Sequence, residues 1–301
     1  LKEIMAVTDR VTVMRRGEVV GETATADTSP AKLAELMVGR PVALEVVREK
    51  GAPGQPVLEV DGLEVRDDRG VPRVWNAGFT VRAGEIVGIA GVSGNGQSEL
   101  LEALAGMRPI AAGRATLKGK PLPADPAAAR RAGIAHVPED RQRLGMLGSF
   151  TAWENHLLGE AGGPLLNRGA AVAACAGAMA GYDVRPPDPE LPAASFSGGN
   201  QQKLVLAREI GRDPDLLLVG QPTRGVDIGA IEFIHRRLLE MRRRGGAVLL
   251  VSAELDELLG LADRILVMYE GRIVGEIAAA AANEAEIGRM MTGVGTLDCP
   301  C

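Results

Sequence analysis

The chain has 301 residues, 46% of them hydrophobic, and a formal net charge of −5. This length and apolar content support one full domain and a remainder. The acidic balance excludes a general basic surface for nucleic acid, and the apolar runs have the length of strands rather than of helices that span a bilayer.

The first 39 residues match residues 255–293 without a gap, at a constant offset of 254. The matching stretches are Asp9-Arg10 with Asp263-Arg264, Val13-Met14 with Val267-Met268, and Val20-Gly21-Glu22 with Val274-Gly275-Glu276. A repeat at the spacing of a whole domain indicates tandem duplication. We expect residues 1–39 to be the C-terminal remnant of a first domain, lost through truncation or an incomplete gene model. The alternative is an N-terminal extension, whose strands would lack a parent sheet. We expect this segment to pack poorly or dock loosely when the chain is alone.

A linker and one complete domain are predicted next. Residues 40–56 are rich in proline and glycine and predict the linker, residues 57–294 predict the domain, and residues 295–301 predict a tail. The strand-like runs are Val57–Val65, Phe79–Val81, Ile86–Ala90, Leu216–Val219, Ala247–Val251, Ile265–Met268 and Arg272–Ile277. Helical segments lie between them, including the alanine-rich stretch Ala170–Ala180. This alternation predicts an α/β fold with a mainly parallel core sheet.

A glycine-rich loop lies between the run Ile86–Ala90 and a helical segment, Glu99–Ala105. It reads Gly91-Val92-Ser93-Gly94-Asn95-Gly96-Gln97-Ser98. Strand, glycine loop and helix are the context of a P-loop, in which backbone N–H groups face a phosphate and the serine hydroxyl holds Mg²⁺. An ordinary glycine-rich turn is the alternative, because Gln97 stands where a P-loop has lysine.

A second phosphate-type element lies about a hundred residues further on, and reads Phe196-Ser197-Gly198-Gly199-Asn200-Gln201-Gln202. It runs directly into a helical segment that ends near Glu209. The first N–H groups of a helix have no intrahelical acceptor, and the helix dipole favours negative charge at this end. The serine hydroxyl and these N–H groups therefore predict an anion site, and two such elements together favour nucleotide binding.

Four motifs in this order resemble those of an ABC-transporter ATPase. They are Gly91–Ser98, Val137–Arg141, Phe196–Lys203 and Leu216–Asp227. The stretches Gly-Asn-Gly-Gln-Ser-Glu-Leu, Pro-Glu-Asp-Arg and Ser-Gly-Gly-Asn-Gln-Gln-Lys are similar to the second nucleotide-binding domain of the fused double-ATPase subunits that drive simple-sugar and nucleoside importers. The run Gln-Pro-Thr-Arg-Gly-Val-Asp is more similar to the nucleoside-type members. The resemblance covers nearly the whole chain.

The resemblance implies a P-loop NTPase fold of ABC type, with an antiparallel β subdomain and a helical subdomain beside the core sheet. It implies ATP and Mg²⁺ as cofactors, with the hydroxyl of Ser98 as a metal ligand. The nucleotide would be held by Gly91, Val92, Ser93, Gly94, Asn95, Gly96, Gln97, Ser98, Glu99 and Glu139. Of these, Glu139 occupies the position of the Q-loop glutamine.

Several groups that the family uses for hydrolysis are replaced. Gly220 stands where the metal-linked aspartate would end the strand Leu216–Val219, and Gln221 occupies the position of the catalytic glutamate. Ala253 occupies the position of the switch histidine. Because an amide does not readily accept a proton at neutral pH, no catalytic residue is assigned, and we expect this P-loop to hydrolyse ATP slowly or not at all.

The signature motif, in contrast, is retained in Ser197, Gly198, Gly199, Asn200 and Gln201, with Phe196 in place of the more usual leucine. In the family, two ATPase domains meet head to tail, and each ATP lies between the P-loop of one and the signature of the other. By resemblance, Asp227 belongs to the loop that contacts the other domain. The signature would complete the site of a second ABC ATPase domain, in an asymmetric pair with one working site.

The resemblance therefore implies an ATP-binding subunit that powers import of a simple sugar or nucleoside, peripheral to the cytoplasmic face of the membrane. Its partners would be integral membrane permease subunits, contacting the region Pro138–Asn155, and indirectly a periplasmic or lipoprotein solute-binding protein. No nucleic-acid partner is expected. The alternatives are a non-catalytic regulatory nucleotide-binding module and a soluble ABC ATPase acting on ribosomes or DNA. The acidic charge and the short Pro/Gly-rich linker disfavour the last.

The remaining candidate residues have structural interpretations. We expect His136 on a strand, His235 as a solvated or capping helix residue, and Arg242-Arg243-Arg244 at a solvated helix end, where cations suit the helix dipole. The cysteines are Cys175, Cys299 and Cys301, whose spacing forms no disulfide framework. They predict a reducing compartment, with free thiols in a frayed tail.

Overall fold

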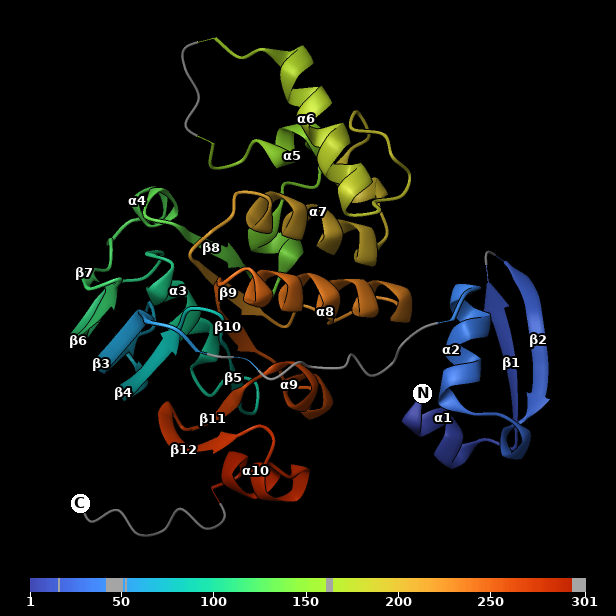
Figure 1. Cartoon of the computed structure of the whole chain (residues 1–301), viewed down its shortest axis with the longest axis horizontal. Coiled ribbons are helices and arrows are strands. Elements are labelled where there is room, and N and C mark those ends of the chain that lie inside the picture. Colours follow the sequence, from blue (N-terminus) through green and yellow to red (C-terminus); the bar gives the residue numbers. More distant parts are fainter. Residues whose placement is uncertain (16, 42–50, 52, 161–164, 294–301) are drawn as a thin grey trace.

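The structure is a computed structural model that describes residues 1–15, 17–41, 51, 53–160 and 165–293. Most of the predicted linker and the whole predicted tail, with Cys299 and Cys301, lie outside the described residues. Figure 1 shows a large body with the core sheet at its centre, and a small N-terminal unit beside it.

The core is a six-stranded sheet with strand order β12-β11-β5-β10-β9-β8. The strands are β5 (Ile86–Ala90), β8 (Ile134–Val137), β9 (Leu216–Gly220), β10 (Ala247–Val251), β11 (Arg264–Tyr269) and β12 (Arg272–Ala278). All neighbours are parallel except β11 and β12. Every residue of β5, β9 and β10 is buried, which explains why these strands are continuous apolar runs. The predicted α/β fold with a mainly parallel sheet is confirmed.

Two apolar layers cover the sheet. On one face, Val87 and Ile89 of β5 pack with Leu100 and Leu104 of α3 (Gln97–Leu104) and with the antiparallel sheet. On the other face, Ile86 packs in the layer formed with the main helices. These helices are α7 (Gly198–Ile210), α8 (Ile228–Arg243), α9 (Leu255–Leu261) and α10 (Glu284–Met291). Alternate residues of one strand thus serve opposite layers.

The two predicted subdomains flank this core (Figure 1). The antiparallel sheet has strand order β4-β3-β6-β7, with β3 (Pro56–Arg66), β4 (Pro72–Arg82), β6 (Ile110–Leu117) and β7 (Lys120–Pro121), and is followed by α4 (Pro126–Arg131). The helical part contains η2 (Arg141–Gly145), α5 (Ala152–His156), α6 (Arg168–Gly181) and η3 (Ala193–Ser195). Its core includes Trp153, Met179 and Phe196. Cys175 lies in the same core, where burial raises the pKa of its thiol to about 11.

The N-terminal unit repeats the last unit of the main body. It contains α1 (Lys2–Val7), β1 (Arg10–Arg15), β2 (Glu18–Ala24), η1 (Thr25–Asp27) and α2 (Pro30–Val38). The β1–β2 hairpin pairs Arg10 with Ala24, and the β11–β12 hairpin pairs Arg264 with Ala278. Both registers shift at the same place, after Val13 in one and after Val267 in the other. The sequence repeat is therefore also a structural repeat.

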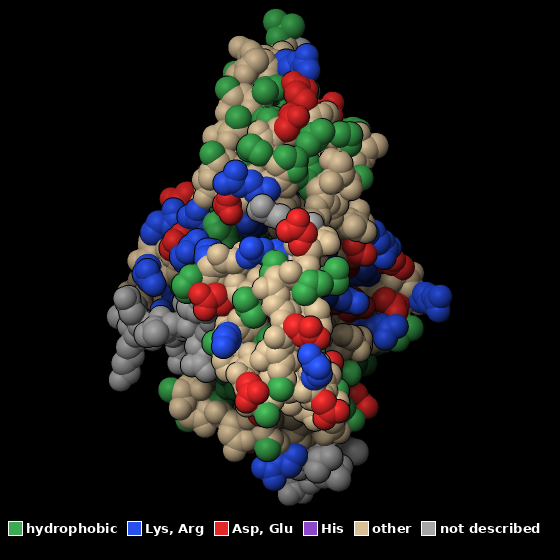
Figure 2. All heavy atoms as spheres, turned by 90° about the vertical axis from the view of Figure 1, so that its right-hand side faces the viewer, with side chains coloured by type: hydrophobic (Ala, Val, Ile, Leu, Met, Phe, Trp, Pro, Cys, Tyr) green, Lys and Arg blue, Asp and Glu red, His purple; other side chains and the backbone are tan. Residues whose placement is uncertain are grey.

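The two copies differ in what covers them. β11 pairs with β5 of the core sheet, whereas β1 belongs to a two-stranded sheet in the described part of the chain. The N-terminal unit has its own small core of Val11, Val13 and Leu33. Figure 2 views the molecule from the side of this unit and shows acidic and basic side chains interspersed over the described surface. It meets the main body where Val38 lies near Gly229 and where Arg40 pairs with Glu232 at 2.8 Å.

We predict that the backbone amides of β1 exchange hydrogen at least about 100-fold faster than the matching amides of β11, because β1 opens without disturbing the core sheet. Hydrogen exchange followed by mass spectrometry compares the two copies within one sample. Equal protection of β1 and β11 would contradict loose docking of residues 1–39.

His136 lies on β8, as predicted, and burial lowers the pKa of its imidazole to about 4 against the attraction of Glu209 and Glu102. The imidazole binds a proton near pH 6.5 in the unfolded chain but only near pH 4 in the folded chain. Its contribution to the free energy of unfolding is therefore fully present above pH 6.5 and is lost as the pH falls from 6.5 to 4. We expect this residue to account for about 1 to 3 kcal/mol of that loss. Urea unfolding of the wild type and of His136→Gln between pH 7 and 4.5 measures it; identical pH slopes would contradict the assignment.

One structural interpretation was wrong, and another holds only in part. His235 of α8 is mostly buried, and its Nε2 lies 2.9 Å from Oε1 of Glu257 on α9. Arg243 and Arg244 are exposed at the end of α8, as predicted, but Arg242 is buried and pairs with Asp263 at 2.6 Å. His235 and Arg242 face neighbouring elements rather than solvent, because the helix carrying them packs against α9 and the start of β11.

Candidate functional site

The P-loop lies between β5 and α3, at the edge of the core sheet where the parallel strands end. Gly94 and Gly96 have φ angles of 93° and 100°, a region that side chains rarely adopt. A Cβ on Gly96 would lie 2.0 Å from the carbonyl oxygen of Arg73. The glycines thus allow the chain to turn sharply and leave the first N–H groups of α3 open to an anion. Val92, Ser93 and Gly94 form the exposed tip.

The side chain of Gln97 turns back into the P-loop. Only 5% of this residue is exposed, and its Nε2 donates a hydrogen bond to the carbonyl oxygen of Val92 at 3.1 Å. Its amide also occupies the space beside Gly91, because a Cβ there would lie 2.2 Å from the same Nε2. Gln97 therefore braces the loop from inside, and its side chain carries no positive charge.

Ser98 and Glu139 meet at the predicted metal position. The hydroxyl of Ser98 donates to Oε2 of Glu139 at 2.8 Å, and Nη1 of Arg224 donates to Oε1 of the same carboxylate at 3.2 Å. Oxygen ligands of this kind suit Mg²⁺ when phosphate oxygens and water complete the shell. Ser98 and Glu139 fit that role, although Gly220 contributes no carboxylate and the described residues hold no cluster of three metal-binding side chains. Glu99 follows in the first turn of α3.

The two replaced catalytic positions contact each other. Gln221 follows β9 with φ of 46°, and its Oε1 accepts a hydrogen bond from the backbone N–H of Ala253 at 3.1 Å. One acceptor site of the side-chain oxygen is thereby occupied, and Nε2 is a donor only. A Cβ on Gly220 would lie 3.0 Å from the backbone nitrogen of Glu139, so an aspartate there would require Glu139 to move. Neither Gln221 nor Ala253 supplies a side chain that accepts a proton at neutral pH.

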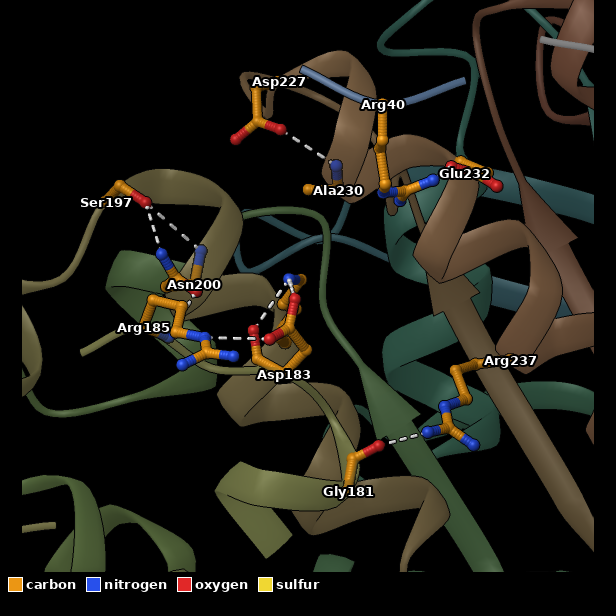
Figure 3. Close-up of polar contacts among 11 residues, drawn as sticks. Arg40, Gly181, Asp183, Arg185, Ser197, Asn200, Asp227, Ala230, Glu232 and Arg237 are labelled. Carbon is orange, nitrogen blue, oxygen red and sulfur yellow. Dashed lines mark hydrogen bonds and ion pairs between the residues drawn. The ribbon is translucent and has the colours of Figure 1, made fainter. Parts of the chain in front are cut away.

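The predicted signature serine, Ser197, accepts a hydrogen bond and lies at the surface. Ser197 caps the N-terminus of α7 and is exposed, and its Oγ accepts from Nδ2 of Asn200 at 2.9 Å (Figure 3). Oδ1 of Asn200 in turn accepts the backbone N–H of Arg185 at 2.8 Å. Because the Ser197 oxygen already serves as an acceptor, its proton is free to be donated outward to an anion.

The signature glycines bring α7 against the loop before α8. Asp227 caps α8 by accepting the N–H of Ala230 at 2.9 Å, as Figure 3 shows. A Cβ on Gly199 would lie 2.9 Å from Oδ2 of Asp227, so this approach requires glycine. Gln201 is buried, and its Nε2 donates to the carbonyl oxygen of Ala193 at 3.1 Å. It anchors the helix and does not face outward with Ser197.

The structure separates the predicted residues into two groups. Gly91–Ser98 gather with Glu139, Gln221 and Ala253 at the ends of the core strands, whereas Ser197–Asn200 and Asp227 lie where α7 meets α8. Arg141 and Arg224, which join these groups, were not singled out as site residues. Their only sequence signal was membership of Pro-Glu-Asp-Arg and Gln-Pro-Thr-Arg-Gly-Val-Asp.

Comparison with known proteins identifies the family of the chain. The family model described as ABC transporter matches residues 74–224. The chain is 47% identical over 304 aligned residues to the glucose import ATP-binding protein TsgD13 of Haloferax volcanii, covering 98% of this chain and 55% of that protein. It is 45% identical to the guanosine import ATP-binding protein NupO of Bacillus subtilis, covering 95% of this chain and 58% of that protein. The chain thus spans little more than half the length of these relatives.

Solved structures show the same fold. A nucleotide-free ATP-binding cassette of an ABC transporter superposes with a TM-score of 0.65 at 21% identity, covering 81% of this chain and 98% of that chain. A dimeric cassette in a post-hydrolysis state, bound to ADP and Pi, gives a TM-score of 0.64 at 20% identity, covering 74% of this chain and 98% of that chain.

The described helices include none with both the length and the apolar character that crossing a bilayer requires. The family match covers half of the chain, and the fold is that of an ATP-binding cassette. The chain therefore belongs to the ABC transporter family and contains its ATP-binding domain.

Proposed function

We propose that this chain is part of an ATP-binding subunit that powers ABC-type import of a simple sugar or nucleoside, and that it lends its signature to the nucleotide site of a second ABC ATPase domain. The observation that carries this proposal is the contrast between two serines. The hydroxyl of Ser197 has a proton free for an external phosphate, whereas the hydroxyl of Ser98 donates to Glu139 and the neighbouring Gln97 amide turns into the P-loop.

The chemistry of the second site supports a silent P-loop. Phosphoryl transfer needs positive charge on the phosphates and a group that positions the attacking water. Gln97 supplies no charge, and the oxygen of Gln221 is engaged by Ala253. ATP and Mg²⁺ would then be bound weakly by Gly91–Ser98, with Ser98 and Glu139 toward the metal, and hydrolysed slowly or not at all.

The glucose and guanosine import functions in the names of the two relatives support the solute class and the partners. The partners would be permease subunits in the membrane and, indirectly, a solute-binding protein, with this chain on the cytoplasmic face. The structural repeat supports residues 1–39 as the end of a first ABC domain and residues 57–294 as the second. Such an arrangement gives Ser197 a partner P-loop within one subunit.

A second candidate is a non-catalytic regulatory module. The hydrogen bond from the backbone N–H of Ala253 to Oε1 of Gln221 favours it, because it joins the two replaced positions to each other. Under this alternative, the assembled subunit would bind nucleotide without turning it over.

Steady-state ATP turnover tests the proposal. We expect the chain alone to show turnover at the background level, and the complete subunit with its membrane partners to hydrolyse ATP. Turnover by the chain alone equal to that of the complete subunit would contradict the silent P-loop. Nucleotide binding without turnover by the complete assembly would instead favour the regulatory module.

A further inference from the structure

Arg141 connects elements that lie far apart in the sequence. It begins η2, directly after β8 and the residues Pro138–Asp140. Asp140 holds this turn by accepting the N–H groups of Gln142 and Arg143 at 3.0 and 3.1 Å. From there the guanidinium of Arg141 reaches the loop between β9 and α8, where Nη1 donates to the carbonyl oxygen of Arg224 at 2.8 Å and Nη2 to that of Gly225 at 3.3 Å.

The same guanidinium lies against the signature. A Cβ on Gly198 would lie 2.6 Å from Nη2 of Arg141 and 2.8 Å from the carbonyl oxygen of Gly225. The first residue of α7, the loop before α8 and the side chain of Arg141 are therefore in direct contact. The Nε of Arg141 is buried and has no hydrogen-bond partner among the described residues, and burial lowers the pKa of this guanidinium against the attraction of Asp140.

A second arginine makes the connection in the opposite direction. Arg224 donates from Nη1 to Oε1 of Glu139, and Glu139 accepts the hydroxyl of Ser98. Thus Arg141 binds the backbone of residues 224–225, and Arg224 binds the side chain of Glu139. A partly buried guanidinium whose carbonyl partners move away loses its hydrogen bonds without water to replace them fully, which costs free energy. We therefore expect residues 139–141 and 224–225 to move together.

We propose that Arg141 is a positioning residue that couples residues 138–145 to the loop 224–227 and to the signature, so that a displacement of 138–145 by a partner changes how Ser197 is presented to a nucleotide. The functional part of this inference rests on the proposed function. The mechanical part, that Arg141 holds the loop and the start of α7 in place, stands on the contacts alone.

The chemistry of arginine sets the expectation for substitutions. Two carbonyl oxygens on neighbouring residues match the two terminal nitrogens of a planar guanidinium, whereas a lysine ammonium is a single point of charge. Arg141→Lys should keep one contact and the charge, and Arg141→Met should keep the buried stem and lose both contacts. Arg143→Met is the matched control, since Arg143 is exposed two residues away and donates no side-chain hydrogen bond within the described residues.

Hydrogen exchange on the whole chain tests the mechanical part. For Arg141→Met we expect amide exchange in 224–228 and 198–201 to rise by about tenfold, with β5 and β10 unchanged, and for Arg141→Lys an intermediate rise. Arg143→Met should leave all four regions unchanged. Unchanged exchange at 198–201 in both Arg141 variants would overturn the proposal, and a uniform rise that includes β5 would do so too, because it would mean general destabilisation.

ATP turnover of the complete subunit with its membrane partners tests the coupling. In Arg141→Met we expect the ratio of solute-stimulated to basal turnover to fall at least about fivefold, with the KM for ATP changed less than about twofold, and Arg141→Lys should recover part of the ratio. A proportional fall of stimulated and basal turnover would overturn the coupling. A wild-type assembly without stimulated turnover would count against the proposed function, and the exchange experiment would still decide whether Arg141 holds the signature.

Discussion

Ser197→Arg in the complete subunit should reduce ATP turnover by about 100-fold or more, since a single preorganised donor to a developing charge is worth about that much. The substitution removes the one hydroxyl whose proton is free at the start of α7. It also places a long side chain where a nucleotide held by the other domain would approach. Steady-state turnover at saturating ATP, with equal amounts of folded protein, measures the effect.

Two control variants separate this effect from simpler ones. Ser195→Arg adds the same charge at an exposed position two residues earlier, and we expect turnover within about threefold of wild type. Gln97→Ala removes the brace of the P-loop, which should cost about 1 kcal/mol of stability and little turnover, because that site is silent. If Gln97→Ala lost more turnover than Ser197→Arg, the assignment of working and silent sites would be reversed.

Glu209→Gln should lower the free energy of unfolding by about 3 to 5 kcal/mol, the loss typical of a buried ion pair deprived of one partner. The Glu209 side chain is 1% exposed, accepts two bonds from Nη1 of Arg130 at 2.8 and 3.0 Å, and accepts Nε of Arg208 at 2.6 Å. A neutral amide would leave two largely buried guanidinium groups without their counter-charge.

Urea unfolding measures this loss, with Asp61→Asn as the control. Asp61 pairs with Arg114 at 2.9 Å, but both side chains are more than two-thirds exposed, so its loss should cost less than about 1 kcal/mol. Equal effects of the two substitutions would show that the α4–α7 contact contributes no more than a surface pair.

Much of the fold followed from apolar runs. β5 and β10 have the predicted bounds, because strands buried on both faces consist of uninterrupted apolar residues with polar neighbours at their ends. β6 was not predicted, since Ile110–Leu117 is largely exposed, contains alanine and glycine, and depends on pairing with β3. Its stability comes from a neighbour about fifty residues earlier in the chain, which local patterning does not reveal.

The candidate site likewise contains residues that motifs predict and contacts that only the folded chain reveals. Gly91–Ser98, Gln221 and Ser197 were predicted as site residues from motifs, because each motif is a short continuous stretch of the sequence. The inward turn of Gln97 and the bond from Ala253 to Gln221 depend on side-chain geometry that no motif specifies. The contacts of Arg141 and Arg224 join residues more than eighty positions apart, so they required the folded chain.

We propose that the signature of this chain serves another domain's nucleotide while its own P-loop is silent. Vanadate trapping of a photoreactive ATP analogue in the complete subunit, followed by peptide mapping, tests it most directly. We expect trapped nucleotide at the P-loop of the other ABC domain, lost in Ser197→Arg, and background labelling of the peptide containing Gly91–Ser98. Equal labelling of both P-loops, or labelling of Gly91–Ser98 alone, would contradict it.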